Sequence, residues 1–460
     1  MLMPRQTFIG SNEDTEIETA KEFENRVRDA EKKALEESAG SDEVIQIGIH
    51  GWNFQNVDFT QIEMSVERWN RFDFSGSHFW GCTFPSFVDI EELRNCGASV
   101  AEQPEDLPFK PFRGFMYTCE ELAMHDQKIY HHFLQSGDLR SLLFRTLHDY
   151  FIQDALFDYL EGKTVIAVMG GHGLKRQDKM YQDVVLVSWK LASQGFVIAS
   201  GGGPGAMEAA NLGAYLAGQD QKSVEEALQI ISTVGYEDGK SYLHDFENKE
   251  APKAVLERFG PSSMSVHPSL GIPTWKYGHE PANMFATWQA KMFSNAVRED
   301  GLIAIANGGI IFSPGSAGTR QEIFQAACRN HYAKKGEAVP MVFFGTEFWE
   351  KSNLISALKH NSESAHFLDW IHVSDNVDEI CRHLVRFRSE NALPVVSLEK
   401  LKKDHSVLFG ENIEIKESKA ALHRRRKGSI ESHRERRKHL KDIVGAFNLS
   451  RANVSYEGTK

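Results

Sequence analysis

The chain has 460 residues, of which 41% are hydrophobic and 25% are charged, so a mostly disordered or fibrous protein is excluded. This length predicts about three folding units of about 150 residues each, rather than one small module. The 52 Lys and Arg residues against 64 Asp and Glu residues give a formal net charge of −12, which argues against a surface that attracts nucleic acid or anionic lipid as a whole.

The first two predicted domains are a charged helical arm, residues 1–41, and a pentapeptide-repeat-like β segment, residues 42–105. The arm is predicted because residues 16–37 are rich in Glu, Lys and Ala. In the β segment apolar residues recur every five positions, as at Phe74, Phe79 and Phe84, and this period fits neither a helix nor a simple strand. The alternative interpretation is a small, aromatic-rich antiparallel sheet. Either structure would serve packing or partner recognition, because the segment offers no convergent acid, base or nucleophile.

A helical connector, residues 106–160, comes next. Leu143, Leu147 and Phe151 belong to a set of apolar residues that recur there at spacings of three and four, which is the pattern of helices with one buried face. We expect these helices to pack against the domain that follows.

Residues 161–388 predict a doubly wound, mostly parallel, Rossmann-like α/β sheet, because short β-branched runs alternate with helical segments. The expected strands are Thr164–Met169, Phe196–Ser200, Gly309–Ser313, Pro340–Phe344 and Trp370–Val373. The expected helices are Lys175–Ala192, Pro204–Ala217, Ala282–Arg298, Ala317–Ala333 and Thr346–His360, with Gln219–Val266 as a helical insertion over the sheet edge. Residues 389–460 form a basic C-terminal tail, which we expect to be a solvated arm.

Three glycine-rich turns stand where a predicted strand passes into a helix. Missing Cβ atoms let a phosphate or a sugar approach the backbone there, and the free N–H groups of a helix start favour negative charge. The carboxyl ends of parallel strands share one edge, so we expect the turns to converge on a ligand. The predicted substrate-binding residues in and beside these turns are Gly170, Gly171, Gly201, Gly202, Gly203, Gly205, Met207, Glu208, Pro314, Gly315, Ser316, Ala317, Gly318 and Thr319. Glycine that serves only tight packing is the alternative for each turn taken alone.

A dinucleotide site is a less favoured interpretation. Gly201-x-Gly203-x-x-Ala206 fits the degenerate GxGxxA pattern, but the acidic residue expected about 20 positions later at the end of a strand is missing.

The two longest glycine motifs resemble the signatures of the Lonely Guy (LOG) family, formerly labelled lysine decarboxylases. They are Gly201-Gly-Gly-Pro-Gly-Ala-Met-Glu208 and Pro314-Gly-Ser-Ala-Gly-Thr-Arg-Gln-Glu322, where Ser316 replaces the second glycine of the usual PGGxGTxxE. The resemblance implies an enzyme that hydrolyses the N-glycosidic bond of a nucleoside 5′-monophosphate to free base and ribose 5-phosphate. It implies no cofactor and a homodimer or higher homo-oligomer.

The resemblance also implies a catalytic pair, Glu322 and Arg298, although Glu299 stands where the family usually has Lys. Between the motifs, Trp275 or Tyr277 is a candidate for stacking on the base. His279 and Glu280 are candidates for binding ribose hydroxyls or protonating the departing base. The alternative is a rigid connecting loop whose aromatic side chains fill the core. Lys291 is a further candidate for the phosphate, with an exposed helical lysine as the alternative.

We expect a nucleoside monophosphate as the substrate, no metal, no membrane partner and no nucleic-acid partner. A cytoplasmic protein is predicted because the chain has no run of about 18 uncharged apolar residues and begins with a polar segment. A non-catalytic nucleotide-binding sensor or regulatory module is the alternative function. Amino-acid decarboxylation is a weaker hypothesis, since no lysine lies in a recognisable pyridoxal-phosphate context.

Overall fold

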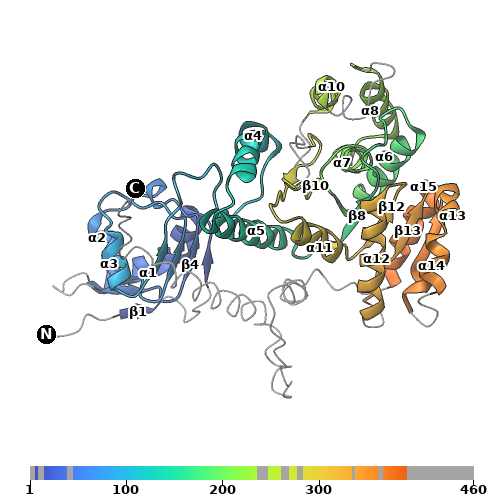
Figure 1. Ribbon diagram of the computed structural model, residues 1–460. Helices are drawn as coiled ribbons and strands as arrows, with labels where there is room; N and C mark the ends of the chain where they lie inside the picture. Colours follow the sequence, from blue (N-terminus) through green and yellow to red (C-terminus); the bar gives the residue numbers. More distant parts are fainter. Residues whose placement is uncertain are drawn as a thin grey trace, which may run out of the picture. The chain divides into compact units, whose positions relative to one another are not determined.

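The computed structural model describes residues 6–8, 15–38, 45–235, 247–260, 269–276, 283–333, 337–360 and 366–390 (Figure 1). They fall into two compact units, the first ending at Gly114 and the second beginning at Phe115. No helix within these ranges is long and apolar enough to cross a bilayer.

The first unit contains two small parallel sheets. The first has the order β1 (Gln6–Phe8), β3 (Gln46–Gly48), β5 (Phe72–Asp73), and the second has the order β2 (Glu16–Ile17), β4 (Asn53–Gln55), β6 (His78–Trp80), β7 (Ser99–Ala101). Short helical segments lie between strands at α1 (Ala20–Ser38), η1 (Phe59–Gln61), α2 (Val66–Trp69) and α3 (Ile90–Asn95). Because each described strand pair in this unit is parallel, the antiparallel interpretation is wrong.

The five-residue period has a direct structural cause in this unit. Phe54 and Phe79 are partners in the register of β4 and β6, and their rings stack with centroids 4.7 Å apart. They are 25 positions apart in the sequence, so five pentads bring the chain back to the same place in the stack. Phe59 and Phe74, also pentad positions, are buried beside them.

Helix α1 differs from the expected charged arm. Phe23 is 0% exposed and packs edge-on against Phe54, Phe59 and Phe72. The buried residues of α1 recur at helical spacing, so one face joins the aromatic core while the Glu- and Lys-rich face stays in solvent. The charge count of residues 16–37 concealed this narrow apolar stripe.

The second unit contains a seven-stranded sheet whose described strand pairs are all parallel, which confirms the Rossmann-like α/β class. Its order is β11 (Trp288–Gln289), β10 (Ser269–Gly271), β9 (Val197–Ser200), β8 (Val165–Met169), β12 (Gly309–Phe312), β13 (Met341–Phe344) and β14 (Ile371–Ser374). The five expected strands are therefore confirmed to within two residues. Tyr117 forms an isolated antiparallel bridge beside the edge strand β11: its N–H donates to Gln289 O at 2.9 Å, and its carbonyl accepts from Gln289 N at 2.8 Å.

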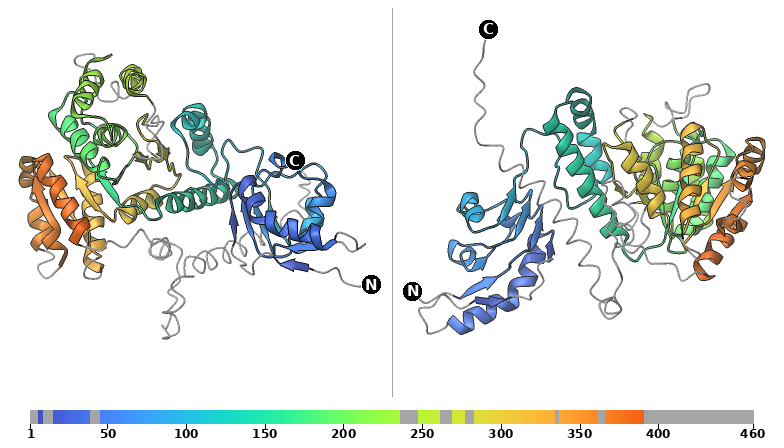
Figure 2. Two further views of the ribbon diagram at one scale, coloured as in Figure 1. Left: turned by 180° about the vertical axis from the view of Figure 1, so that it is seen from behind. Right: turned by 60° about the horizontal axis from the view of Figure 1, so that its bottom comes forward.

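The second unit also contains helical segments. They are α4 (Cys119–Gln135), α5 (Leu139–Leu160), α6 (Lys179–Ala192), α7 (Ala206–Tyr215), α8 (Gln221–Thr233), α10 (Glu250–Phe259), α11 (Asn295–Ile305), α12 (Ala317–Tyr332), α13 (Thr346–Lys351), α14 (Leu354–His360), η2 (His366–Trp370) and α15 (Val377–Glu390). Helices α13, α14 and α15, in orange, lie with β13 and β14 at one end of the sheet (Figure 2).

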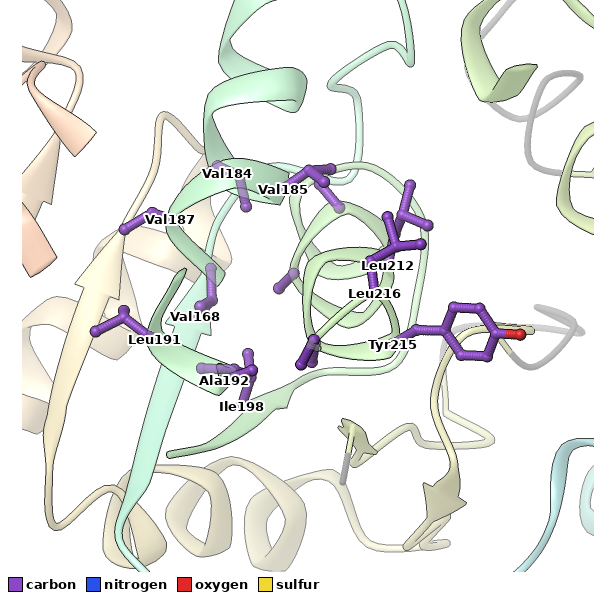
Figure 3. Close-up of a cluster of buried hydrophobic side chains, with 14 of the residues drawn as sticks. Val168, Val184, Val185, Val187, Leu191, Ala192, Ile198, Leu212, Tyr215 and Leu216 are labelled. Atoms are coloured by element: carbon purple, nitrogen blue, oxygen red, sulfur yellow. The ribbon is translucent and has the colours of Figure 1, made fainter. Parts of the chain in front are cut away.

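A large buried cluster lies where α6 and α7 cover the central strands. Val168 of β8 and Ile198 of β9 meet Leu191 of α6 and Leu212 of α7, and all four are 0% exposed (Figure 3). Burial of such side chains stabilises the fold by about 1.5–3 kcal/mol each. The polar stretch expected as a helical insertion supplies α8 and α10, whose apolar faces join this same cluster.

One expected helix, residues 282–298, is wrong. Part of it pairs as the strand β11, and helix α11 begins only at Asn295. Ser294 caps α11 by accepting from the backbone N–H of Val297, so the helix cannot extend further back. Alternating small and apolar residues before Ser294 had concealed this boundary. A second expected helix is divided into α13 and α14 at Asn353, whose φ of 55° interrupts helical geometry.

Candidate functional site

The three glycine turns converge at the carboxyl edge of the seven-stranded sheet. Strand β8 lies between β9 and β12, so the chain winds outward from it in both directions and the turns after β8 and β12 flank the switch point. The turn after β8 contacts both others, because Gly171 N donates to Pro314 O at 2.9 Å and Gly171 O accepts from Ala206 N at 3.1 Å. This edge is where open parallel sheets bind their ligands.

Close packing explains some of the glycines. A Cβ on Gly205, whose φ is +67°, would lie 2.4 Å from Gly171 O, and one on Gly170 would lie 1.9 Å from Ser313 Oγ. Such distances are shorter than van der Waals contact, so these two positions require glycine for the turns to meet. Tight packing thus accounts for Gly170 and Gly205 without a ligand.

The start of α12 is open. Ser316, Ala317 and Gly318 are exposed, and a Cβ built on Gly318 would meet no heavy atom within 4 Å. The Ser316 side chain makes no capping hydrogen bond to this 16-residue helix. Within the described ranges, no acceptor is present for the backbone N–H groups of Ala317 and Gly318. The helix dipole adds positive potential at the same place, so this turn suits an anion.

Arg298 connects the second glycine turn to α12. Its side chain projects from α11, is 8% exposed, and donates from Nε to Ile272 O at 2.7 Å and from Nη2 to Gly201 O at 3.4 Å. A Cβ on Gly201 would lie 2.1 Å from Nη2, so glycine at this position makes room for the guanidinium. Glu322 lies close enough for Arg298 to be the principal charge that lowers the pKa of its carboxyl.

Glu322 lies one helical turn beyond the open start of α12 and is half-buried. Burial is the main cause that raises the pKa of its carboxyl from 4.5 to about 7, Arg298 opposes this rise, and Glu299 adds to it. A carboxyl with this pKa exchanges its proton near neutral pH, which is the property of a general acid or base. Arg298, which contacts Gly201, therefore lies near enough to Glu322 for the charges of the predicted pair to interact.

Glu299 is a neighbour whose role the sequence did not reveal. Its carboxylate accepts from Asn295 Nδ2 at 2.7 Å and from Gln321 Nε2 at 2.9 Å, so it joins α11 to α12. It is 8% exposed and places a second negative charge near Glu322. Its position directly after Arg298 was the sequence feature that could have indicated a role in the site.

A buried amide and hydroxyl network lies beneath the second glycine turn. Asn211 accepts from Ser200 Oγ at 2.7 Å and from Asn283 Nδ2 at 3.1 Å, and it donates to Ser269 Oγ at 2.8 Å. Ser200 Oγ in turn accepts from Gly202 N at 3.1 Å. The network therefore holds the turn from below, and it could not be predicted because its members come from four separate segments.

Several candidate residues lie elsewhere. Glu208 is 3% exposed and binds Arg176 with both oxygens at 2.6 and 2.9 Å, and it also accepts from Tyr181 Oη at 2.9 Å. Its carboxylate is therefore held between α7 and the segment around α6. Met207 is nearer the site, because a Cβ on Gly201 would lie 2.6 Å from its sulfur.

The candidates between the two motifs are mostly core residues. Trp275 is 0% exposed, stacks on Phe293 with centroids 4.4 Å apart, and donates from Nε1 to Asp126 at 2.8 Å. Stacking of Trp275 on a base is therefore wrong, and its interpretation as a core residue is right. Lys291 is 1% exposed and pairs with Asp126 at 2.7 Å, so it is neither exposed nor open to a phosphate. Tyr277, His279 and Glu280 lie outside the described residues.

Comparison with known proteins finds likeness only among solved structures. No family model matches the chain, and no curated protein matches it. The molybdenum cofactor binding protein from Rippkaea orientalis is 16% identical, with a TM-score of 0.29, over 49% of this chain and 96% of that one. The molybdenum cofactor carrier protein from Chlamydomonas reinhardtii is 13% identical, with a TM-score of 0.29, over 49% of this chain and 99% of that one. The α/β class of this chain rests on its own strand order and parallel pairing.

Proposed function

We propose that the second unit hydrolyses the N-glycosidic bond of a nucleoside 5′-monophosphate, releasing the base and ribose 5-phosphate, as its resemblance to the LOG family implies. The observation that carries this proposal is the meeting of an open helix start with a half-buried carboxyl of raised pKa, Glu322, and a buried guanidinium, Arg298. An anion site beside an acid of this kind suits a phosphorylated sugar whose glycosidic bond lies a few ångströms away.

The chemistry assigns one role to each part. The backbone N–H groups at the start of α12 hold the 5′-phosphate, and this remote binding positions the ribose. As the bond from C1′ to the base nitrogen lengthens, its electron pair leaves with the base and C1′ becomes positive. The ionised Glu322 carboxylate stabilises that charge and takes a proton from the attacking water. Arg298 fixes the carboxylate and contacts the substrate. The water oxygen forms the new bond to C1′, and the proton that Glu322 has taken from the water passes to the departing base, so that the carboxylate is regenerated.

The test uses the full chain with AMP, GMP and CMP, and measures free base and ribose 5-phosphate by chromatography. We expect turnover by the native chain and its loss in Glu322→Gln, with nucleotide binding retained by calorimetry. Glu350→Gln, at an exposed position on α13, is the matched control and keeps activity. If the native chain cleaves none of the three nucleotides across pH 5 to 9, the enzymatic proposal fails.

A nucleotide sensor without turnover is the second candidate. It is favoured by Arg298, whose Nε is already held by the Ile272 carbonyl, and by the negative charge that Glu299 adds beside Glu322. Both features limit catalysis more than binding: a guanidinium tied to a backbone carbonyl is less free to follow the reacting atoms, and Glu299 keeps the Glu322 carboxyl protonated to higher pH. Saturable binding of a nucleotide with no product, and with a signal that Glu322→Gln leaves unchanged, supports the sensor over the enzyme.

A homodimer or higher homo-oligomer and a cytoplasmic location complete the proposal, the first from the family resemblance and the second from the composition. Light scattering of the full chain tests the first, since a mass of 52.0 kDa would mark a monomer. Cell fractionation tests the second.

A further inference from the structure

A sealed chain of hydrogen bonds lies between helix α5 and the segment that leads into α11. The Tyr117 hydroxyl lies 2.6 Å from Nε2 of His148, and Nδ1 of His148 lies 3.1 Å from Oδ1 of Asp149. A carboxylate can only accept, so Nδ1 donates to Asp149 and Nε2 accepts from Tyr117. Tyr117, His148 and Asp149 are 2%, 0% and 4% exposed. Water therefore has no access to this chain of contacts, and the partners fix the imidazole tautomer.

At the other end of this chain of hydrogen bonds, Asp149 binds the backbone at the start of α11. The Asp149 oxygens accept from Phe293 N at 2.8 Å and Ser294 N at 2.7 Å. Ser294 is the N-cap of α11, and its carbonyl accepts from Arg298 N at 3.1 Å. Asp149 is thus two hydrogen bonds away from the Arg298 backbone, and its negative charge lies at the positive end of the helix dipole.

Helix α4 contacts the segment whose backbone accepts from the guanidinium. Asp126 accepts from Trp275 Nε1 at 2.8 Å and pairs with Lys291 Nζ at 2.7 Å. Trp275 ends the short segment whose Ile272 carbonyl accepts from Arg298 Nε at 2.7 Å. The hairpin of α4 and α5 therefore fixes both the helix that carries Arg298 and the carbonyl that orients it.

Stability alone does not explain a buried carboxylate at this place. Removing a charge from water costs several kcal/mol, and a well-packed apolar contact usually stabilises as much as a buried polar one. What directional hydrogen bonds add is a defined position. We propose that Asp149, oriented by His148 and Tyr117, is a positioning residue that sets the Arg298 guanidinium against Glu322. The catalytic meaning of this role rests on the proposed function, whereas the placement of Arg298 does not.

The test compares Asp149→Asn and Tyr117→Phe with the control Asp138→Ala in the full chain. Asp138 caps the same helix, α5, by accepting from Ser141 N at 2.9 Å, so its loss weakens α5 without touching α11. The readout is titration of the Glu322 carboxyl by carbon-13 NMR without nucleotide, with Glu322→Gln used for assignment. We expect the midpoint in Asp149→Asn to rise by about 0.5 or more, because Arg298 moves away from the carboxyl that it favours in the ionised form. Tyr117→Phe shifts it less in the same direction, and Asp138→Ala leaves it unchanged.

Activity gives a second, separable result. If the native chain cleaves a nucleotide, Asp149→Asn lowers kcat by about tenfold or more with a smaller change in KM, which is the pattern for lost orientation in the transition state. A midpoint shift in a chain with no activity supports the positioning role and counts against the proposed function. An unshifted midpoint in folded Asp149→Asn overturns the positioning role even when the native chain is active. If Asp149→Asn fails to fold, Tyr117→Phe decides in the same way.

Discussion

The raised pKa of Glu322 makes the stability of the second unit depend on pH. In Glu322→Gln the carboxyl group is replaced by an amide, which does not ionise. The folded native chain holds the Glu322 proton more tightly than the unfolded chain, since burial raises its pKa from 4.5 to about 7. Its contribution to stability is therefore fully present below pH 4.5 and is lost as the pH rises through about 7.

The size follows from the two pKa values. Between pH 5 and pH 8 the native chain should lose about 2.5 kcal/mol of unfolding free energy through this one group, whereas Glu322→Gln should lose none of it. The difference between the two proteins thus grows by that amount in favour of the variant. Other carboxyl groups titrate equally in both and cancel.

Urea unfolding at the two pH values measures this difference. Hydrogen exchange in the buried strands β8 and β12 follows the second unit separately, because the two units need not unfold together. Glu350→Gln is the control, since its side chain is exposed. A native-to-variant difference that changes by less than about 0.5 kcal/mol between pH 5 and pH 8 would refute the assignment of a raised pKa to Glu322.

Three further predictions follow from the packing around the site. Gly201→Ala puts a Cβ 2.1 Å from Arg298 Nη2 and should lower kcat/KM by about tenfold or more, while Gly301→Ala, whose Cβ meets nothing closer than 4.0 Å, should not. Glu299→Gln removes a negative neighbour and should lower the pKa of Glu322, which moves the rising limb of the pH profile of kcat/KM to lower pH; an unmoved limb contradicts the proximity of the two groups. Gly213→Ala puts a Cβ 2.3 Å from Val185 O, where α7 crosses α6, and should cost about 2 kcal/mol or more in urea unfolding, against no loss for the open position Gly137→Ala.

The sequence predicted those strands and turns that a local residue pattern determines. Strands such as Val165–Met169 are continuous β-branched and apolar runs, and the glycine turns after them follow from the same alternation. Strands β10 and β11 have three and two residues and exist because β9 and Tyr117 pair with them, so no local signal marks them. The same limit led to the helix expected over residues 282–298.

The residues of the candidate site were predicted only in part. Arg298 and Glu322 were named through family resemblance, and in the structure Arg298 contacts Gly201 and lowers the pKa of the Glu322 carboxyl through its charge. Glu208 shares a motif with that glycine, but its partner, Arg176, lies 32 residues earlier, and no motif records such an ion pair. Asp149 was missed for the same reason, because the backbone groups that it binds at the start of α11 lie more than 140 residues later in the chain.

The pairing of Tyr117 with Gln289 has a consequence for how copies of this chain behave in a crowded solution. An unpaired outer strand is a template on which another polypeptide can add, and that is how many sheets begin to polymerise. Here Tyr117, two residues before α4, already pairs with Gln289 of β11. Tyr117 therefore occupies this edge of the sheet. We expect that displacing residues 115–118 would expose β11 and promote aggregation while the central strands are still intact.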